Sequence, residues 1–147
     1  MINNSNLSED CARSIILNLS ENAKLNIINY NISNSKSFLY FEINQQNKSN
    51  LKFLSFQSNN VHTRNEFFAS LEENCSLDLY GLNIHNYGVN DNYSFIQHMK
   101  PSSQSREVFK SIVKSGAITN FQGKIYVDSI AQTTDGYQMS RSLILDN

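Results

Sequence analysis

A sequence repeat in the first half of the chain constrains the fold more than any other feature. Its three copies begin at the evenly spaced positions Glu21, Asn47 and Glu73. The apolar positions of the copies superpose as Leu25/Leu51/Leu77, Ile27/Phe53/Leu79, Ile28/Leu54/Tyr80 and Tyr30/Phe56/Leu82. A polar residue separates the first two positions in every copy, and this period-two alternation indicates a strand with one buried face.

Each copy consists of a polar turn that leads into such a strand, and a second short strand is predicted after the first two copies. These second strands cover residues 38–43 and 66–71. One unit of this kind cannot bury its own apolar face, but stacked units share a core, as in solenoids and β-helices. Periodicity alone leaves open a β-sandwich or meander with evenly spaced strands.

The C-terminal third keeps the character of strands, and its pattern predicts a shorter spacing. Residues 121–127 and 139–145 both alternate, and the pairs Ile125/Leu143 and Val127/Leu145 have the same separation, which is smaller than that between the repeat copies. The polar stretch between these strands, residues 128–138, is predicted to contain Gly136 as a turn residue. The segment 106–114 fits an amphipathic helix or a strand equally well.

Composition bounds the class of protein. The chain has 147 residues and a formal net charge of −1, which predicts one domain and argues against a general nucleic-acid binder or a polybasic membrane-surface protein. No segment has the apolar length of a membrane span. Residues 1–10 lack the basic start of a secretory signal, so a cytoplasmic location is expected. The 43 Asn and Ser residues reflect an AT-rich genome or frequent turns, since Asn tolerates positive φ.

The residues that usually carry chemistry form no recognisable centre. Three histidines (His62, His85 and His98) lack metal-ligand spacing, and the five glycines form no phosphate-binding loop. The acidic pairs available are Glu72 with Glu73, and Asp78 with Asp91; neighbouring acids of this kind are usually a solvated edge.

The two cysteines are equally uninformative about catalysis. Cys11 and Cys75 are far apart in the sequence, without metal-ligand spacing, and are expected to be reduced. Cys75 occupies the place that Ala23 and Ser49 take in the earlier copies, which predicts a small residue at a turn-to-strand junction. We therefore expect no catalytic, cofactor-binding or metal-binding residue in this chain.

Several motifs from residue 64 onward carry a resemblance to a known family. They are Arg64-Asn-Glu66, Cys75-Ser-Leu-Asp-Leu-Tyr-Gly-Leu82, Asp91-Asn-Tyr-Ser94 with His98, Glu107-Val-Phe-Lys-Ser-Ile-Val113, Phe121-Gln-Gly-Lys-Ile-Tyr-Val127, and Ala131-Gln-Thr-Thr-Asp-Gly-Tyr-Gln138 followed by Leu143-Ile-Leu145. In order and spacing they resemble the core domain shared by SufB and SufD, the scaffold proteins of SUF iron–sulfur cluster assembly, and the match is closer to SufD. Tyr93 departs from the family, which commonly has His after Asp-Asn.

The resemblance implies a fold and a role. The family fold is an all-β, right-handed parallel β-helix, here over residues 1–147, and it makes the segment 106–114 a strand. The implied role is that of a non-catalytic scaffold acting through protein–protein contacts in a complex with a SufB-like protein and a SufC-like ATPase. That complex handles an iron–sulfur cluster, and the ATPase uses ATP.

The resemblance also sets expectations about what is missing. The chain stops at Asn147, before the Cys-containing segment and the helical SufC-binding region of SufD, so the β-helix is expected to be truncated at its C-terminal end. No functional residue of the family is carried over. The alternatives are a structural β-solenoid module and, with less support, a polysaccharide-acting β-helix enzyme, which would need carboxylates and basic residues on successive rungs.

Overall fold

A computed structural model describes residues 2–3, 10–32, 35–58, 61–114 and 116–145, and every described element is a β-strand. Most of the N-terminal segment on which the expectation about a secretory signal rests, residues 1 and 4–9, lies outside the described residues, as does the chain end at residues 146–147. The strands are β1 (Ile2–Asn3), β2 (Cys11–Leu19), β3 (Lys24–Asn31), β4 (Ser37–Gln45), β5 (Asn50–Ser58), β6 (His62–Leu71), β7 (Ser76–His85), β8 (Val89–His98), β9 (Gln104–Lys114), β10 (Ile118–Val127) and β11 (Asp135–Leu145).

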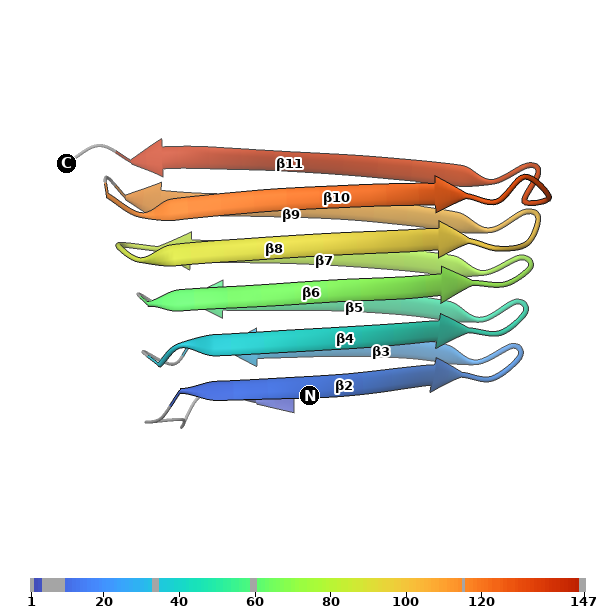
Figure 1. Cartoon of the computed structure of the whole chain (residues 1–147), viewed down its shortest axis with the longest axis horizontal. Helices are drawn as coiled ribbons and strands as arrows, with labels where there is room; N and C mark the ends of the chain where they lie inside the picture. The colour runs from blue at the N-terminus through green and yellow to red at the C-terminus, as the bar shows by residue number, and fades with distance from the viewer. Residues whose placement is uncertain (1, 4–9, 33–34, 59–60, 115, 146–147) are drawn as a thin grey trace.

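The strands alternate between two parallel sheets. Sheet A has the order β1-β3-β5-β7-β9-β11, and sheet B has the order β10-β8-β6-β4-β2. Figure 1 shows sheet B as the front layer, running left to right, with sheet A behind it running back while the chain climbs from β2 to β11. This path is a right-handed solenoid of about five turns, which confirms the predicted parallel β-helix. Every strand pairing is parallel, so the sandwich and the meander are excluded.

Strand register reproduces the sequence repeat. Leu25 pairs with Leu51 and Leu51 with Leu77, and the other three predicted columns align in the same way. The columns that begin at Leu25 and Ile27 face the interior, whereas those that begin at Ile28 and Tyr30 face outward. The repeat thus contains both core positions and an apolar outer surface.

The predicted short spacing in the C-terminal third is wrong, because Ile125 and Leu143 belong to different sheets. The turns of the solenoid grow instead. Ser76 pairs with Gln104, and Gln104 pairs with Asp135, so the interval between register partners lengthens at each step. The prediction of Gly136 as a turn residue is also wrong. It lies inside β11, and this longer strand occupies part of the stretch that looked like a turn.

Segment 106–114 is a strand, as the family resemblance implied. Strands β2 and β8 were not anticipated from the sequence. Their inward positions are largely polar in β8 and only partly buried in β2, so neither gives a clear apolar alternation.

The turns that carry the chain from sheet B to sheet A stack on one another. Each contains one residue in the left-handed region, and these residues are Asn22, Lys48, Asn74, Ser102 and Thr133. The amide nitrogens of the first four donate to carbonyl oxygens of the following turn, over 2.9–3.1 Å. Asn at two of these positions agrees with the expectation that Asn serves turns with positive φ.

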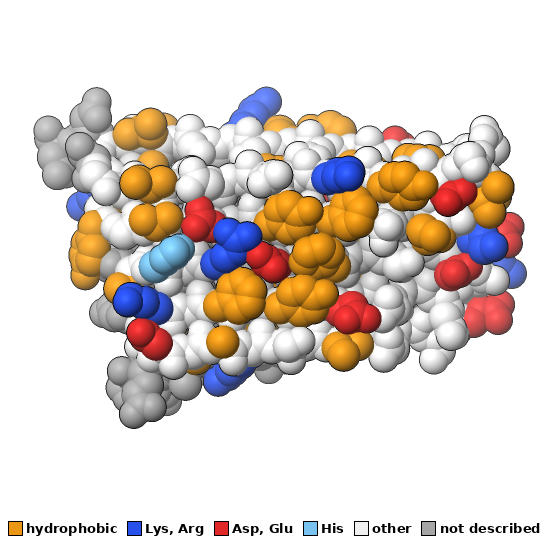
Figure 2. Space-filling view, viewed as in Figure 1, with side chains coloured by type: hydrophobic (Ala, Val, Ile, Leu, Met, Phe, Trp, Pro, Cys, Tyr) orange, Lys and Arg blue, Asp and Glu red, His pale blue; other side chains and the backbone are white. Residues whose placement is uncertain are grey.

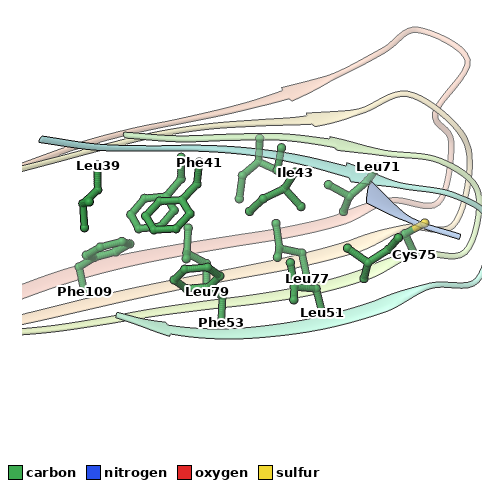
Figure 3. Packing of buried hydrophobic residues seen from close by; sticks show 14 residues of the cluster. Leu39, Phe41, Ile43, Leu51, Phe53, Leu71, Cys75, Leu77, Leu79 and Phe109 are labelled. Atoms are coloured by element: carbon green, nitrogen blue, oxygen red, sulfur yellow. The ribbon is translucent and has the colours of Figure 1, made fainter. Parts of the chain in front are cut away.

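The apolar core occupies the part of the interior next to these turns (Figure 3). The rings of Phe41 and Phe67 stack with centroids 5.0 Å apart, and Phe53 meets both edge-on, at 4.9 and 5.4 Å. Phe109 continues this cluster into β9, where its ring lies against the backbone of Gly81. A Cβ atom at Gly81 would overlap that ring, so the close packing requires glycine there.

Candidate functional site in the polar interior and on the outer faces

The other half of the interior is polar and is filled by side-chain amides. Gln57 Nε2 donates to Asn65 Oδ1 over 2.6 Å, and Asn65 Nδ2 donates to Asn92 Oδ1 over 2.9 Å. Asn90 Nδ2 donates to Gln57 Oε1 and to Thr63 Oγ1, both over 2.7 Å, and Asn92 donates to Asn90. All five side chains are buried. Because the amides satisfy one another, this network holds the two sheets in register and offers no open ligand position.

Glu107 is a fully buried acid in the interior of β9. Ser94 Oγ donates to Glu107 Oε2 over 2.9 Å, and Oε1 has no hydrogen-bond partner among the described residues. Burial raises the pKa of Glu107 to about 7, and the hydrogen bond from Ser94 only partly opposes this shift. Glu107 therefore exchanges a proton near neutral pH, although sequence patterning gave no signal that this acid faces inward.

His98 lies between two serines at the start of the turn after β8. Its Nδ1 bonds to Ser103 Oγ, and its Nε2 lies 2.8 Å from Ser105 Oγ. Burial lowers the pKa of His98, and the charge of Asp135 partly offsets this effect. With both ring nitrogens engaged, His98 holds the turn in place, and His85 is likewise buried, at the end of β7.

Cys75 directly precedes β7, as Ala23 precedes β3 and Ser49 precedes β5, so it occupies the same place in its turn, as predicted. Its side chain is buried, and Sγ donates to the carbonyl oxygen of Gln46 over 3.1 Å. Cys75 and the half-buried Cys11 are both free thiols. The burial of Cys75 suits a small packing residue at a turn-to-strand junction.

The outer face of sheet B carries the polar cluster that sequence reasoning missed. His62 Nε2 lies 3.1 Å from Asp91 Oδ2, Asn120 Nδ2 donates to Asp91 Oδ1 over 2.7 Å, and Arg64 pairs with Glu66 at 2.6 Å. Partial burial opposes ionisation of Asp91, but the hydrogen bonds from Asn120 and His62 and the charges of His62 and Arg64 outweigh it and lower its pKa. The contact between His62 and Asp91 joins two neighbouring turns of the solenoid. Predicting it from the sequence would have required the number of residues that separate register partners in β6 and β8.

Asp78 and Asp91 are not brought together, since they face outward on different sheets. Asp78 pairs instead with Lys52 at 4.0 Å. Glu72 and Glu73 lie on a turn, with Glu73 exposed, which agrees with a solvated edge.

Hydrophobic side chains lie beside the charged groups on this face (Figure 2). The ring of Phe68 lies 5.2 Å from that of Tyr40, 5.5 Å from Tyr93 and 6.4 Å from Phe95. Tyr93, the residue that departs from the family pattern, thus packs in an outer aromatic row. A shallow hollow of about 450 Å³ opens beside the row and is lined by Cys11, Phe38 and other residues, mostly with apolar surface.

Within the described ranges, no three His, Cys, Asp or Glu side chains lie close enough together to hold a metal ion. The same residues contain no helix long and apolar enough to cross a membrane. The geometry is that of a solenoid whose polar interior is hydrogen-bonded in most places, with the oxygens Asn29 Oδ1, Gln45 Oε1 and Glu107 Oε1 as exceptions among the described residues, and with two broad outer faces.

Comparison with protein families gives a match that covers nearly the whole chain. Residues 4–147 match the family described as SUF system FeS cluster assembly, SufBD core domain. The chain belongs to the SufBD core family. No curated protein and no solved structure matches it. Membership confirms the family resemblance seen in the motifs and connects this β-solenoid with SUF iron–sulfur cluster assembly, at a level common to SufB and SufD.

Proposed function

We propose that the chain is a SufD-like scaffold component of SUF iron–sulfur cluster assembly and that residues 1–147 form a single β-helical core. It acts in the cytoplasm through protein–protein contacts, without catalysing a reaction, in a complex with a SufB-like scaffold and a SufC-like ATPase. The observation that carries the proposal is the family match over residues 4–147.

The described side chains support a scaffold rather than a catalyst. The buried amides Asn65, Asn90 and Asn92 are engaged with one another, and Cys75 is enclosed. Glu107 lies fully buried in the interior with a serine as its hydrogen-bond donor. Rigid sheets with large outer faces favour binding over chemistry, since groups that act on a substrate must be accessible to it.

The choice of SufD over SufB rests on the sequence motifs, with the stretch from Glu107 to Leu145 as the strongest part. Co-expression with the SUF proteins of the same organism tests this choice. We expect the chain to co-purify with a tagged SufB-like protein and to be absent from a purification on a tagged SufD-like protein. Co-purification with the SufD-like protein alone would make the chain SufB-like, and co-purification with neither would contradict the scaffold proposal.

A further inference from the structure

The outer surface of sheet A carries an apolar area over β3, β5 and β7, beside a polar column formed by Asn26, Lys52 and Asp78. Two outward columns cross these strands, and their members are Ile28, Leu54, Tyr80, Tyr30, Phe56 and Leu82. The side chains of Ile28 and Leu54 are 47% and 38% exposed, and the rings of Tyr30 and Phe56 stack with centroids 5.2 Å apart. We call this surface the apolar face. Its side chains lie in register on neighbouring strands, and Ile28, Leu54 and Tyr80 line a hollow of about 250 Å³ on this surface.

The column that begins at Tyr30 becomes basic where it continues onto β9 and β11. Lys110 and Arg141 are direct register partners, both exposed, and Lys114 follows on the same side of β9. None of the three has an ion-pair partner among the described residues, and their columns contain no acid. Like charges side by side on paired strands are destabilising, so this arrangement lowers the stability of the chain when it is alone.

Size and charge together restrict what can cover the surface. Five strands at about 4.8 Å spacing and about six residues along each strand at about 3.3 Å give a planar area of roughly 500 Å². Stable dimers bury about 800 Å² on each partner, and transient complexes bury less. A second copy would bring another apolar face and three more unpaired cations, while the acid beside this face, Asp78, is already paired with Lys52 at 4.0 Å, which disfavours self-association.

We propose that the apolar face and its basic border bind, transiently, a protein that presents an apolar surface bordered by carboxylates. The inference deepens the proposed scaffold function and rests on it for the expectation that this partner is a SUF component. Side chains aligned in register across a sheet, with a hollow between them, favour a protein over a membrane, since insertion into lipid requires apolar side chains that project into the acyl region.

The test places a photo-reactive benzoyl-phenylalanine at position 54, or at position 16 as a control, in the full chain expressed in its own organism. Ile16 is 59% exposed, but it lies on the outer face of sheet B. We expect illumination to join position 54 to an apolar segment of one partner flanked by Asp or Glu, as mapped by mass spectrometry. Position 16 should not give this product.

Lys110→Glu supplies the second arm, because it places a carboxylate beside Arg141. This variant should raise the melting temperature while lowering the yield of the cross-linked product about tenfold, since it removes attraction for an acidic partner. Lys124→Glu on sheet B is the matched control and should leave the yield unchanged.

Each other outcome contradicts the inference or the proposed function on which it rests. Cross-links from position 54 to a second copy, to lipid or to nothing would overturn it, as would a yield that Lys110→Glu does not change. A carboxylate-bordered partner from outside the SUF system would leave the binding surface in place but contradict the proposed function, so the two failures are distinguishable.

Discussion

Single buried polar residues decide how stable this solenoid is and at which pH. Among the residues that the structure describes, six asparagines have buried side chains in the interior, namely Asn29, Asn31, Asn65, Asn83, Asn90 and Asn92. They bind one another and nearby hydroxyl groups, and this limits the cost of placing amides inside a core. Glu107 differs because it is an acid, and only one of its oxygens has a hydrogen-bond partner among the described residues.

Glu107→Gln is predicted to stabilise the protein above neutral pH. The ordinary pKa of this carboxyl is 4.5 and its folded value is about 7, so unfolding releases a proton in this range. The free-energy cost of burying the ionised carboxylate is absent below about pH 4.5, grows as the pH rises and levels off above about pH 7. Above pH 7, Glu107→Gln removes this cost and increases the free energy of unfolding by about 3 kcal/mol.

Urea denaturation at pH 4 and pH 8 measures this difference, with Glu73→Gln on an exposed turn as the control. The lowered pKa of His98 reduces the free energy of unfolding as the pH falls below about 6.5. This effect is the same in wild type and in Glu107→Gln, so it cancels when the two proteins are compared at one pH. Equal unfolding free energies for wild type and Glu107→Gln at pH 8 would show that Glu107 is not buried as described.

Gly81→Ala should destabilise the core, whereas Gly123→Ala should be nearly neutral. A Cβ at Gly81 overlaps the buried ring of Phe109, and that ring is packed against Phe67 and Phe121. Overpacking of this kind costs about 1–3 kcal/mol. At Gly123 the nearest atoms belong to the end of the Gln138 side chain, which can move away. Thermal melting of the two variants gives the comparison, and similar melting temperatures would contradict the packing around Phe109.

At the scale of the strand and the turn, the repeat is maintained by one left-handed residue in each turn between sheets B and A. Lys48 has φ of 60°. This conformation is strained for a residue with a Cβ atom but not for glycine. The Lys48 amide still donates to Glu73 O in the next turn, so the turns form a ladder beside the strands.

Lys48→Gly is therefore predicted to stabilise the protein by about 0.5 kcal/mol. The relief of backbone strain is partly offset because glycine loses more conformational entropy on folding than lysine does. Lys52→Gly, inside β5, should destabilise it by about 1 kcal/mol, because strands disfavour glycine. Chemical denaturation of both variants checks the opposite signs. Two changes of the same sign would contradict the left-handed turn.

The strands and their register follow from the sequence only where the turns keep one length. The evenly spaced repeat predicted that Leu51 superposes on Leu25 and Leu77, and the structure confirms it as strand pairing. It did not distinguish inward Ile27 from outward Ile28, since both are apolar and adjacent. The contact of His62 with Asp91 and the burial of Glu107 were missed, because both depend on turns that lengthen after β6.

For the whole molecule, the combination of a fixed interior and two different outer faces is what a scaffold requires. Sheet B presents mixed charges among aromatic rings, with Arg64 bound to Glu66 and His62 to Asp91. Sheet A presents an apolar face with a basic border at Lys110 and Arg141. Two faces of distinct chemistry on one rigid body allow different partners to be held at fixed positions, and this fits a SufBD core domain in cluster assembly.

The most direct test of this account is to delete the gene in its own organism and to measure the activity of several iron–sulfur enzymes. We predict that their activity falls while the amounts of their polypeptides and the activity of metal-free enzymes stay constant, and that re-expression restores them. Unchanged iron–sulfur enzyme activity, with the SUF system as the only assembly route in use, would contradict the central claim.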